Sequence, residues 1–169
     1  MNTVAKFEKV SREEFGKSIK NLCFDLEIVD KLYNNIRLPK RATKGSAGYD
    51  FYSPIDCIFT QGQSVVIPTG IRCKMQEGWV LTLYPRSGMG FKTGTRFANT
   101  VGVIDSDYYF SDNEGHIMLK LVNDGVLGKD VSIKTGDGIC QGIFLPFGVT
   151  EDDNATAIRN GGFGSTDKQ

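Results

Sequence analysis

The stretch from residue 99 to residue 108, NTVGVIDSDY, carries the densest group of chemically useful side chains in this sequence. It places the Asn99 amide, the Asp105 carboxylate and the Tyr108 phenol within one turn-and-strand unit. Because an apolar run leads into Asp105, we expect this carboxylate at the mouth of a hydrophobic wall, where its basicity rises and it can hold a water for attack. Tyr108 offers a flat ring for a sugar or base. The alternative is a solvated hairpin with a capping aspartate.

A second group of residues is suited to binding phosphate. The segment PRSGMG, residues 85–90, combines the Arg86 guanidinium, the Ser87 hydroxyl and two glycines, of which Gly88 is the first. Backbone N–H groups of such a glycine turn, at the end of an expected strand, can cradle a phosphate together with these side chains. A tight turn with an exposed arginine is the alternative.

Two shorter segments have little meaning alone. Asp50 is the last residue of the segment AGYD, residues 47–50. It follows a glycine turn and comes just before an expected strand, a position where aspartate is common in ordinary turns. Gln141 ends GDGICQ, residues 136–141, where a turn leads into a strand and the amide can donate to a phosphate oxygen. By itself the second segment indicates only a hairpin.

The C-terminal tail reads RNGGFGSTD over residues 159–167. A plain linker is usually rich in Gly, Ser or Lys and lacks a single aromatic anchor flanked by an arginine and two hydroxyls. Phe163, between glycines, can close over a flat base while Arg159, Ser165 and Thr166 reach a terminal phosphate. The pattern therefore favours a functional arm over a linker.

The composition excludes several classes of function. The 169 residues include 20 basic and 20 acidic side chains, a balance that argues against a nucleic-acid partner. No apolar run approaches the roughly 20 residues of a membrane span, and the N-terminus lacks the apolar core of a secretory signal, so we expect a cytoplasmic protein with no membrane partner. The four cysteines form no Cys-x-x-Cys pair and His116 is the only histidine, which disfavours zinc sites and Ser–His or Cys–His nucleophiles.

The elements that position these residues are predicted to be short β-strands. Twenty glycines separate segments rich in Val, Ile, Phe and Tyr, a pattern typical of an all-β sandwich or barrel. The expected strands span residues 56–60, 64–73, 78–85, 115–123, 131–134 and 138–146. One amphipathic helix is expected from about residue 12 to about residue 31, because Ser11 and Glu14 have capping-box spacing and apolar residues follow at helical period. We expect one domain over 1–169, with an N-terminal helical extension (1–37), a β-barrel (38–147) and a Gly-rich C-terminal arm (148–169).

Together and in this order, the five segments resemble those of the homotrimeric all-β dUTPase family, over roughly residues 38–167. The resemblance implies a jelly-roll-like β-barrel and a homotrimer whose active sites are shared between subunits. It also implies hydrolysis of dUTP to dUMP and pyrophosphate, which keeps uracil out of DNA and supplies dUMP for thymidylate synthesis.

The resemblance also implies a role for each residue. Asp105 would be the general base that activates a water for attack on the α-phosphorus, and Asp50 would hold waters of a Mg²⁺ ion on the triphosphate. Asn99 would bind the uracil edge, and Tyr108 would pack on the deoxyribose and leave no room for a 2′-hydroxyl. The residues expected to hold phosphate are Arg86, Ser87, Gly88 and Gln141, with Arg159, Ser165 and Thr166 on the γ-phosphate and Phe163 covering the uracil.

Three departures from the family pattern stand out. Gly138 occupies a position where the family usually has arginine, residues 109–115 lengthen the hairpin after Tyr108, and Asp167 stands where glycine is frequent. Two alternatives stay open. A dCTP deaminase needs a glutamate general base, and the corresponding position here is Lys120. A non-enzymatic jelly-roll module would have no need for the combination of Asp105, Ser87 and Arg159.

Overall fold

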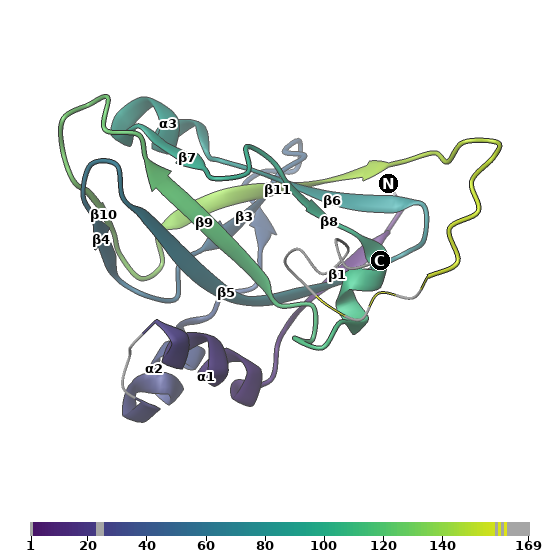
Figure 1. The fold of residues 1–169 in the computed structure, drawn as a ribbon, viewed down its shortest axis with the longest axis horizontal. Coiled ribbons are helices and arrows are strands. Elements are labelled where there is room, and N and C mark those ends of the chain that lie inside the picture. The colour runs from purple at the N-terminus through teal and green to yellow at the C-terminus, as the bar shows by residue number, and fades with distance from the viewer. Residues whose placement is uncertain (1, 23–25, 158, 160, 162–169) are drawn as a thin grey trace.

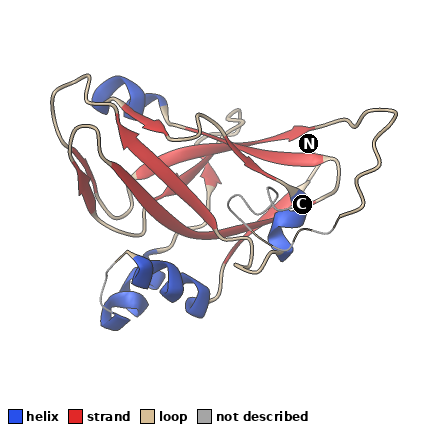
Figure 2. Ribbon diagram, in the orientation of Figure 1, coloured by secondary structure: helices blue, strands red, loops and turns tan. Residues whose placement is uncertain are grey.

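The computed structural model describes residues 2–22, 26–157, 159 and 161 (Figure 1). Within these ranges the chain is mostly β-sheet, with short helices at the N-terminus, after β6 and after β8 (Figure 2). All strand pairs are antiparallel. The predicted all-β class is therefore correct at the level of secondary structure.

Two larger sheets and one two-stranded sheet make up the β-structure. The four-stranded sheet has the order β1 (Ala5–Lys9), β5 (Ser64–Met75), β9 (Ile117–Asn123) and β7 (Thr95–Phe97). The five-stranded sheet has the order β2 (Lys40–Arg41), β3 (Tyr49–Tyr52), β11 (Gly138–Pro146), β6 (Trp79–Tyr84) and β8 (Gly102–Ile104). The third sheet joins β4 (Cys57–Phe59) to β10 (Val131–Ile133).

The part of the chain that the structure describes forms no closed barrel, so of the predicted jelly-roll-like β-barrel only the β-sheet content is confirmed. The larger sheets are open, ending at β1 and β7 in one and at β2 and β8 in the other. Closure requires strand tilt and register to bring two edges together, and an alternating sequence pattern contains no signal for either. The jelly-roll connectivity stays a prediction.

The core lies where buried side chains of both larger sheets join one cluster. β9 shows the expected alternation, because Ile117, Leu119 and Leu121 are buried while Lys120 between them is exposed. Leu81 and Leu83 of β6 are likewise buried within the five-stranded sheet. Such alternation places one face of each strand on the core.

The N-terminal region differs from its prediction in two ways. The single helix expected over residues 12–31 is in fact α1 (Arg12–Asn21), a 3₁₀ turn η1 (Leu26–Ile28) and α2 (Val29–Asn35). α1 packs against α2, so the chain must turn between them. The helical spacing of apolar residues continues across this turn, which is why the sequence predicted one helix. Residues Ala5–Lys9 form β1 on the edge of the four-stranded sheet, so the extension is not purely helical.

The start of α1 follows the sequence closely. Ser11 is the N-cap, and its hydroxyl accepts a hydrogen bond from the Glu14 N–H at 3.0 Å. Phe15 and Ile19 of this helix are fully buried and belong to the same core cluster as the sheets. Across the residues described, no helix is long and apolar enough to cross a membrane.

Candidate active site

A cavity of about 400 Å³ brings together four residues that the sequence analysis singled out. Asn99, Asp105 and Tyr108 line it with Arg159, which lies more than fifty positions further along the chain. The remaining lining residues come from β6, β7, β8, β9 and the loop after β7: Leu83, Phe97, Ala98, Gly102, Val103, Ile104, Ile117, Met118, Leu119 and Lys120. The site is thus a largely apolar hollow with a few polar groups, as expected of a small-molecule site.

Asp105 lies at the junction of a strand and a 3₁₀ helix. β8 pairs with β6 through Ile104 and Leu81, and Asp105 follows as the N-cap of η2 (Ser106–Phe110). Its side chain is 47% exposed in the single chain, so the apolar wall shields it less than expected. The reason is its place at the end of the strand, beyond the last paired residue. The turn that follows Asp105 is the 3₁₀ helix η2.

Tyr108 is a buried, hydrogen-bonded residue of the cavity lining. The residue is 7% exposed, its hydroxyl donates to the carbonyl oxygen of His116 at 2.8 Å, and it accepts from Asn113 Nδ2 at 2.9 Å. Burial raises the pKa of the Tyr108 phenol above its ordinary value. The phenol therefore stays protonated at neutral pH and serves as a packing surface.

The loop that carries Asn99 has a strained backbone. Thr100 adopts φ +65°, a left-handed conformation that a β-branched residue rarely takes and that costs roughly 1–3 kcal/mol. The neighbouring Ala98 N–H donates to the Lys120 carbonyl at 2.9 Å, and the Val101 N–H donates to the Asn99 carbonyl at 2.7 Å. This turn holds the exposed Asn99 at the rim of the cavity.

Arg159 connects the C-terminal arm to this cavity. Its guanidinium donates to Oδ2 of Asp105, and its Nε donates to Oδ1 of Asp107 at 3.0 Å. The guanidinium carbon also lies 5.9 Å from the centroid of the Tyr108 ring. In Figure 1 the yellow segment after β11 loops away from the sheets and curves back toward them. Phe163, Ser165 and Thr166 lie outside the described residues.

Asp107 was missed as a site residue. The sequence analysis placed it inside the segment 99–108 without a role, although it stands two positions from Asp105. Both carboxylates contact the same guanidinium in the structure. The close spacing of the two acids was the available signal.

The second group of predicted residues lies around the ends of β3, β6 and β11. Asp50 and Gln141 are direct partners across β3 and β11, and Arg86 follows the end of β6. Nε of Arg86 lies 3.3 Å from Oδ1 of Asp50, whose side chain is 18% exposed. Asp50 itself lies within β3 and not before it.

Ser87 and Gly88 begin a helix where a glycine turn was expected. α3 (Ser87–Thr93) follows Arg86, and both residues are exposed. Arg86, Ser87 and Gly88 line a second cavity of about 460 Å³ together with Met89, Lys92, Thr93, Val131, Ser132, Ile133, Asp137, Gly138 and Ile139. A basic, hydroxyl-bearing hollow of this kind suits an anion.

Two glycines leave room for this group. A Cβ atom at Gly48 would lie 2.8 Å from Oε1 of Gln141, so any side chain there would displace the amide. A Cβ atom at Gly138 would collide with the Arg86 guanidinium. Gly138 is the position where the family usually has arginine, and here its lack of a side chain makes space for Arg86 beside Asp50.

The two groups lie apart within one chain. Asp105 follows Ile104, which pairs with Leu81, and Arg86 comes five residues after Leu81 along the β6 direction. At about 3.3 Å per residue this places the backbone of Arg86 roughly 17 Å along β6 from the Ile104–Leu81 pair that precedes Asp105. Within the described ranges, no three His, Cys, Asp or Glu residues gather as a metal cage.

Comparisons with known proteins agree on one family. The family model that matches is dUTPase, over residues 34–167. A Lactococcus lactis subsp. lactis protein named deoxyuridine 5′-triphosphate nucleotidohydrolase is 43% identical over 144 residues, which is 83% of this chain and 95% of that protein. A Haemophilus ducreyi protein of the same name is 38% identical over 154 residues, covering 86% of this chain and 97% of the relative. The crystal structure of dUTPase from Streptococcus mutans superposes with a TM-score of 0.67 at 34% identity, covering 86% of this chain and 98% of that one.

Proposed function

The chain belongs to the dUTPase family, and on that premise we propose that it hydrolyses dUTP to dUMP and pyrophosphate. In this role it removes a precursor of uracil in DNA and supplies dUMP for thymidylate synthesis. The observation that carries the proposal is the cavity in which Asn99, Asp105 and Tyr108 of the segment 99–108 meet Arg159 of the C-terminal arm.

Asp105 is proposed as the general base. Arg159 contacts Oδ2 of its carboxylate, and the second oxygen of a carboxylate can accept a proton from water. Attack of that water on the α-phosphorus releases pyrophosphate as the leaving group. No covalent nucleophile is required, because phosphoryl transfer depends mainly on positioning and on neutralising charge.

Asn99 and Tyr108 are proposed to select the nucleoside. The Asn99 amide at the rim can donate and accept, and so can pair with the uracil edge, whereas cytosine presents the opposite donor and acceptor pattern. A mismatched base leaves buried polar groups unpaired, which can cost a factor of about 10⁴ in specificity. The rigid Tyr108 ring packs on the deoxyribose and excludes a 2′-hydroxyl.

Arg86, Ser87, Gly88 and Gln141 are proposed to hold the phosphates. The Arg86 guanidinium, oriented by Asp50, supplies charge and paired N–H donors suited to phosphate. On the C-terminal arm, Arg159, Ser165 and Thr166 would bind the γ-phosphate and Phe163 would cover the uracil. In that case Arg159 exchanges its present carboxylate partners for phosphate when substrate binds.

Asp50 is also proposed to hold waters of a Mg²⁺ ion. A lone half-buried carboxylate fits this ion, which prefers several waters, few protein ligands and the oxygens of a bound triphosphate. When bound, such an ion would neutralise charge that develops on the phosphates. The role of this chain is to orient the Asp50 carboxylate through Arg86 and the β3–β11 pairing.

A homotrimer with shared sites is proposed because one chain separates the two groups. A triphosphate is only three phosphoryl groups long, whereas the backbone of Arg86 lies roughly 17 Å along β6 from the pair that precedes Asp105, so we propose that these two groups of one chain serve different triphosphates. A neighbouring subunit would bring its own Arg86 group to this chain's Asp105. Closed rotational symmetry makes each such contact recur in every subunit.

Product analysis with four nucleotides tests this proposal. We expect pyrophosphate from dUTP, far less from dCTP, dTTP or UTP, and a strong dependence on Mg²⁺. In ¹⁸O-labelled water the label is expected in dUMP, because the water attacks the α-phosphorus. Ammonia from dCTP would instead identify a deaminase, and no turnover of any nucleotide would indicate a binding module.

A further inference from the structure

The segment upstream of the family match contacts the lengthened loop near the active site. Residues 1–33 precede the match, and within them β1 pairs with β5 so that Glu8 lies opposite Arg72. The Tyr109 hydroxyl donates to Oε2 of Glu8 at 2.7 Å. The Arg72 guanidinium carbon lies 3.7 Å from the centroid of the Tyr109 ring, a close cation–π contact. The segment upstream of the family match and loop 109–115, which departs from the family pattern, thus touch each other.

Glu114 ties the other side of this loop to the start of α1. Ser11 donates its N–H to Oε2 of Glu114 at 2.7 Å and its hydroxyl to Oε1 at 2.6 Å. Nη1 of Arg72 lies 3.5 Å from the same carboxylate. Glu114 adopts φ +58°, a conformation that is unfavourable for a residue with a side chain. The two bonds from Ser11 hold the turn in this conformation.

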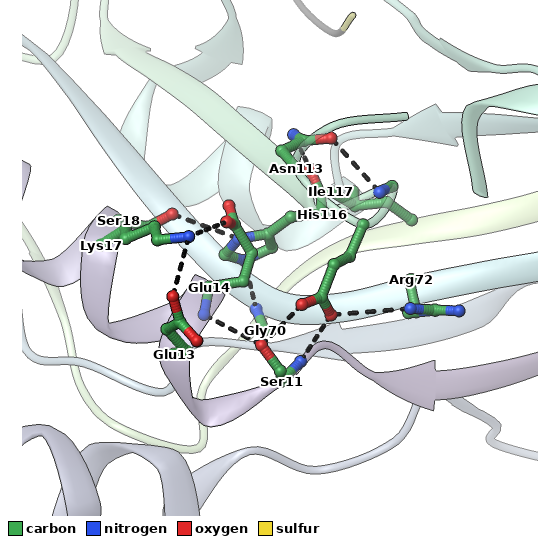
Figure 3. Close-up of polar contacts among 12 residues, drawn as sticks. Ser11, Glu13, Glu14, Lys17, Ser18, Gly70, Arg72, Asn113, His116 and Ile117 are labelled. Carbon is green, nitrogen blue, oxygen red and sulfur yellow. Dashed lines mark hydrogen bonds and ion pairs between the residues drawn. The ribbon is translucent and has the colours of Figure 1, made fainter. Parts of the chain in front are cut away.

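The loop end is also anchored in the core through His116 (Figure 3). This residue is fully buried, and its Nε2 accepts the Gly70 N–H at 2.9 Å where a bulge interrupts β5. Because Nε2 is an acceptor, the neutral ring carries its proton on Nδ1, which faces Ser18 Oγ of α1 at 3.2 Å. α1 therefore holds the loop at two points.

The same loop encloses Tyr108 from several sides. The Ser111 hydroxyl donates to the Tyr108 carbonyl at 2.7 Å, and Asn113 Nδ2 donates to the Tyr108 hydroxyl at 2.9 Å. The Tyr108 hydroxyl in turn donates to the His116 carbonyl at 2.8 Å. At Gly115, with φ +71°, an added Cβ would lie 2.7 Å from the Tyr108 carbonyl oxygen. The position of the Tyr108 ring therefore depends on the contacts that hold loop 109–115 and the adjoining His116 in place.

We propose that Glu8 and Ser11 of the upstream segment are positioning residues for nucleotide selection. They act through Tyr109 and Glu114 to fix the Tyr108 ring in the place where it excludes a 2′-hydroxyl. This inference rests on the proposed hydrolysis of dUTP and assigns to the upstream segment a part in telling dUTP from UTP. A displacement of about 1 Å at a packing surface is enough to change rates strongly.

Two variants with matched controls test the proposal. Glu114→Gly removes both bonds to Ser11 while glycine accepts the positive φ without strain, and Asp112→Ala removes an exposed acid from the same loop. Glu8→Ala removes the partner of Tyr109, and Glu13→Ala removes an acid that pairs with Lys17 on its own helix at 3.2 Å. For each protein, kcat/KM is measured with dUTP and with UTP, and Tm is measured in parallel.

We expect the ratio of kcat/KM for dUTP to that for UTP to fall about tenfold in Glu114→Gly and severalfold in Glu8→Ala. Both controls should keep the wild-type ratio within about twofold. Glu114→Gln, whose side-chain oxygen still accepts from Ser11, should recover part of the ratio. A lower Tm with an unchanged ratio in both test variants would mean a purely structural role and would overturn the inference.

The wild-type measurement distinguishes failure of the proposed function from failure of the positioning role. Strong pyrophosphate release from dUTP with unchanged ratios in the variants leaves the proposed function standing and refutes the positioning role alone. Absence of pyrophosphate release from dUTP in the wild type refutes the proposed function, and the positioning role with it.

Discussion

At the scale of single residues, the site depends on which carboxylate oxygens the Arg159 guanidinium contacts. Arg159 binds Oδ2 of Asp105 and Oδ1 of Asp107, so two neighbouring acids share one guanidinium. They are about equally exposed, at 47% and 53% of their side-chain surface. Their chemical difference must therefore come from position relative to the substrate, since Asp105 lines the cavity and Asp107 does not.

That difference predicts unequal effects of two matched substitutions. Asp105→Asn is expected to lower kcat for dUTP by about 10²–10⁴, the usual scale for loss of a general base, while dUTP still binds. Asp107→Asn should cost less than about tenfold, because it removes only one contact to Arg159. Single-turnover kinetics and calorimetric binding of a non-hydrolysable analogue measure the two effects. Equal losses in both variants would contradict the assignment of the base.

Gly138 offers a second prediction at this scale. In Gly138→Ala the new methyl group would displace the Arg86 guanidinium from Asp50, so KM for dUTP should rise by about tenfold. Gly45→Ala is the matched control, because no atom lies within 4 Å of an added Cβ there. Steady-state kinetics with Tm measurements distinguish a displaced arginine from a destabilised fold. A Gly138→Ala enzyme with wild-type KM would show that Arg86 needs no such space.

At the scale of elements, the packing of α1 on the sheets encloses a titratable cluster. His116 is fully buried between Gly70 of β5 and Ser18 of α1, and Glu14 Oε1 lies 3.9 Å from its Nδ1. Burial lowers the pKa of His116 from 6.5 to about 4. A proton on Nε2 would also face the Gly70 N–H, so protonation breaks this hydrogen bond. The junction is therefore built for a neutral histidine.

This geometry predicts loss of stability in acid. Because the folded-state pKa of His116 lies below the unfolded value, the unfolded chain binds the proton first, and stability falls as pH decreases from 6.5 to about 4. The lost free energy of unfolding is on the order of 3 kcal/mol at 1.36 kcal/mol per pKa unit. Burial raises the pKa of Glu14, which works in the opposite direction over the acid range and offsets part of the loss.

Urea unfolding between pH 4 and pH 8, at one chain concentration, measures this dependence. His116→Gln keeps an acceptor for Gly70 but does not titrate, so its pH slope should be smaller than that of the wild type. An identical slope in the two proteins would show that other groups control acid stability.

At the scale of the whole molecule, the two halves of the proposed site lie at different positions along β6. Asp105 follows Ile104 at one end of the β6–β8 pairing, and the backbone of Arg86 lies roughly 17 Å further along β6 from Leu81, the partner of Ile104. In the proposed homotrimer, Asp105 of one subunit and Arg86 of another would act on the same triphosphate. In that proposal the assembly is part of the chemistry and not only of the stability.

Subunit mixing tests this arrangement directly. Homogeneous Asp105→Asn and Arg86→Ala proteins are each expected to be nearly inactive, since every site lacks one group. After joint unfolding and refolding, about a quarter of the sites should combine an intact Asp105 with an intact Arg86 from another chain. Pyrophosphate release from dUTP should therefore recover to about that fraction. Inactive mixtures, with light scattering showing trimers, would place both groups in one subunit's site.

The sequence by itself determined the local features. Alternating apolar residues predicted β9, the glycine-flanked segments predicted β5, β6 and β11 to within a few residues, and Ser11 predicted the start of α1. These predictions succeed because the alternation of side chains along a strand or helix, and the residue preferences of turns, depend on a few neighbouring residues. The chemically useful residues were also visible, because their types and order resemble one family.

Only the tertiary structure decided how distant segments meet. The open sheets, the strand β1, the turn between α1 and α2, and the pairing of Arg159 with Asp105 and Asp107 all depend on contacts between residues far apart in the chain. The burial of His116 and the bonds from Ser11 to Glu114 are of the same kind. Such contacts follow from packing three-dimensional surfaces together, and no periodicity along the sequence encodes which surfaces those will be.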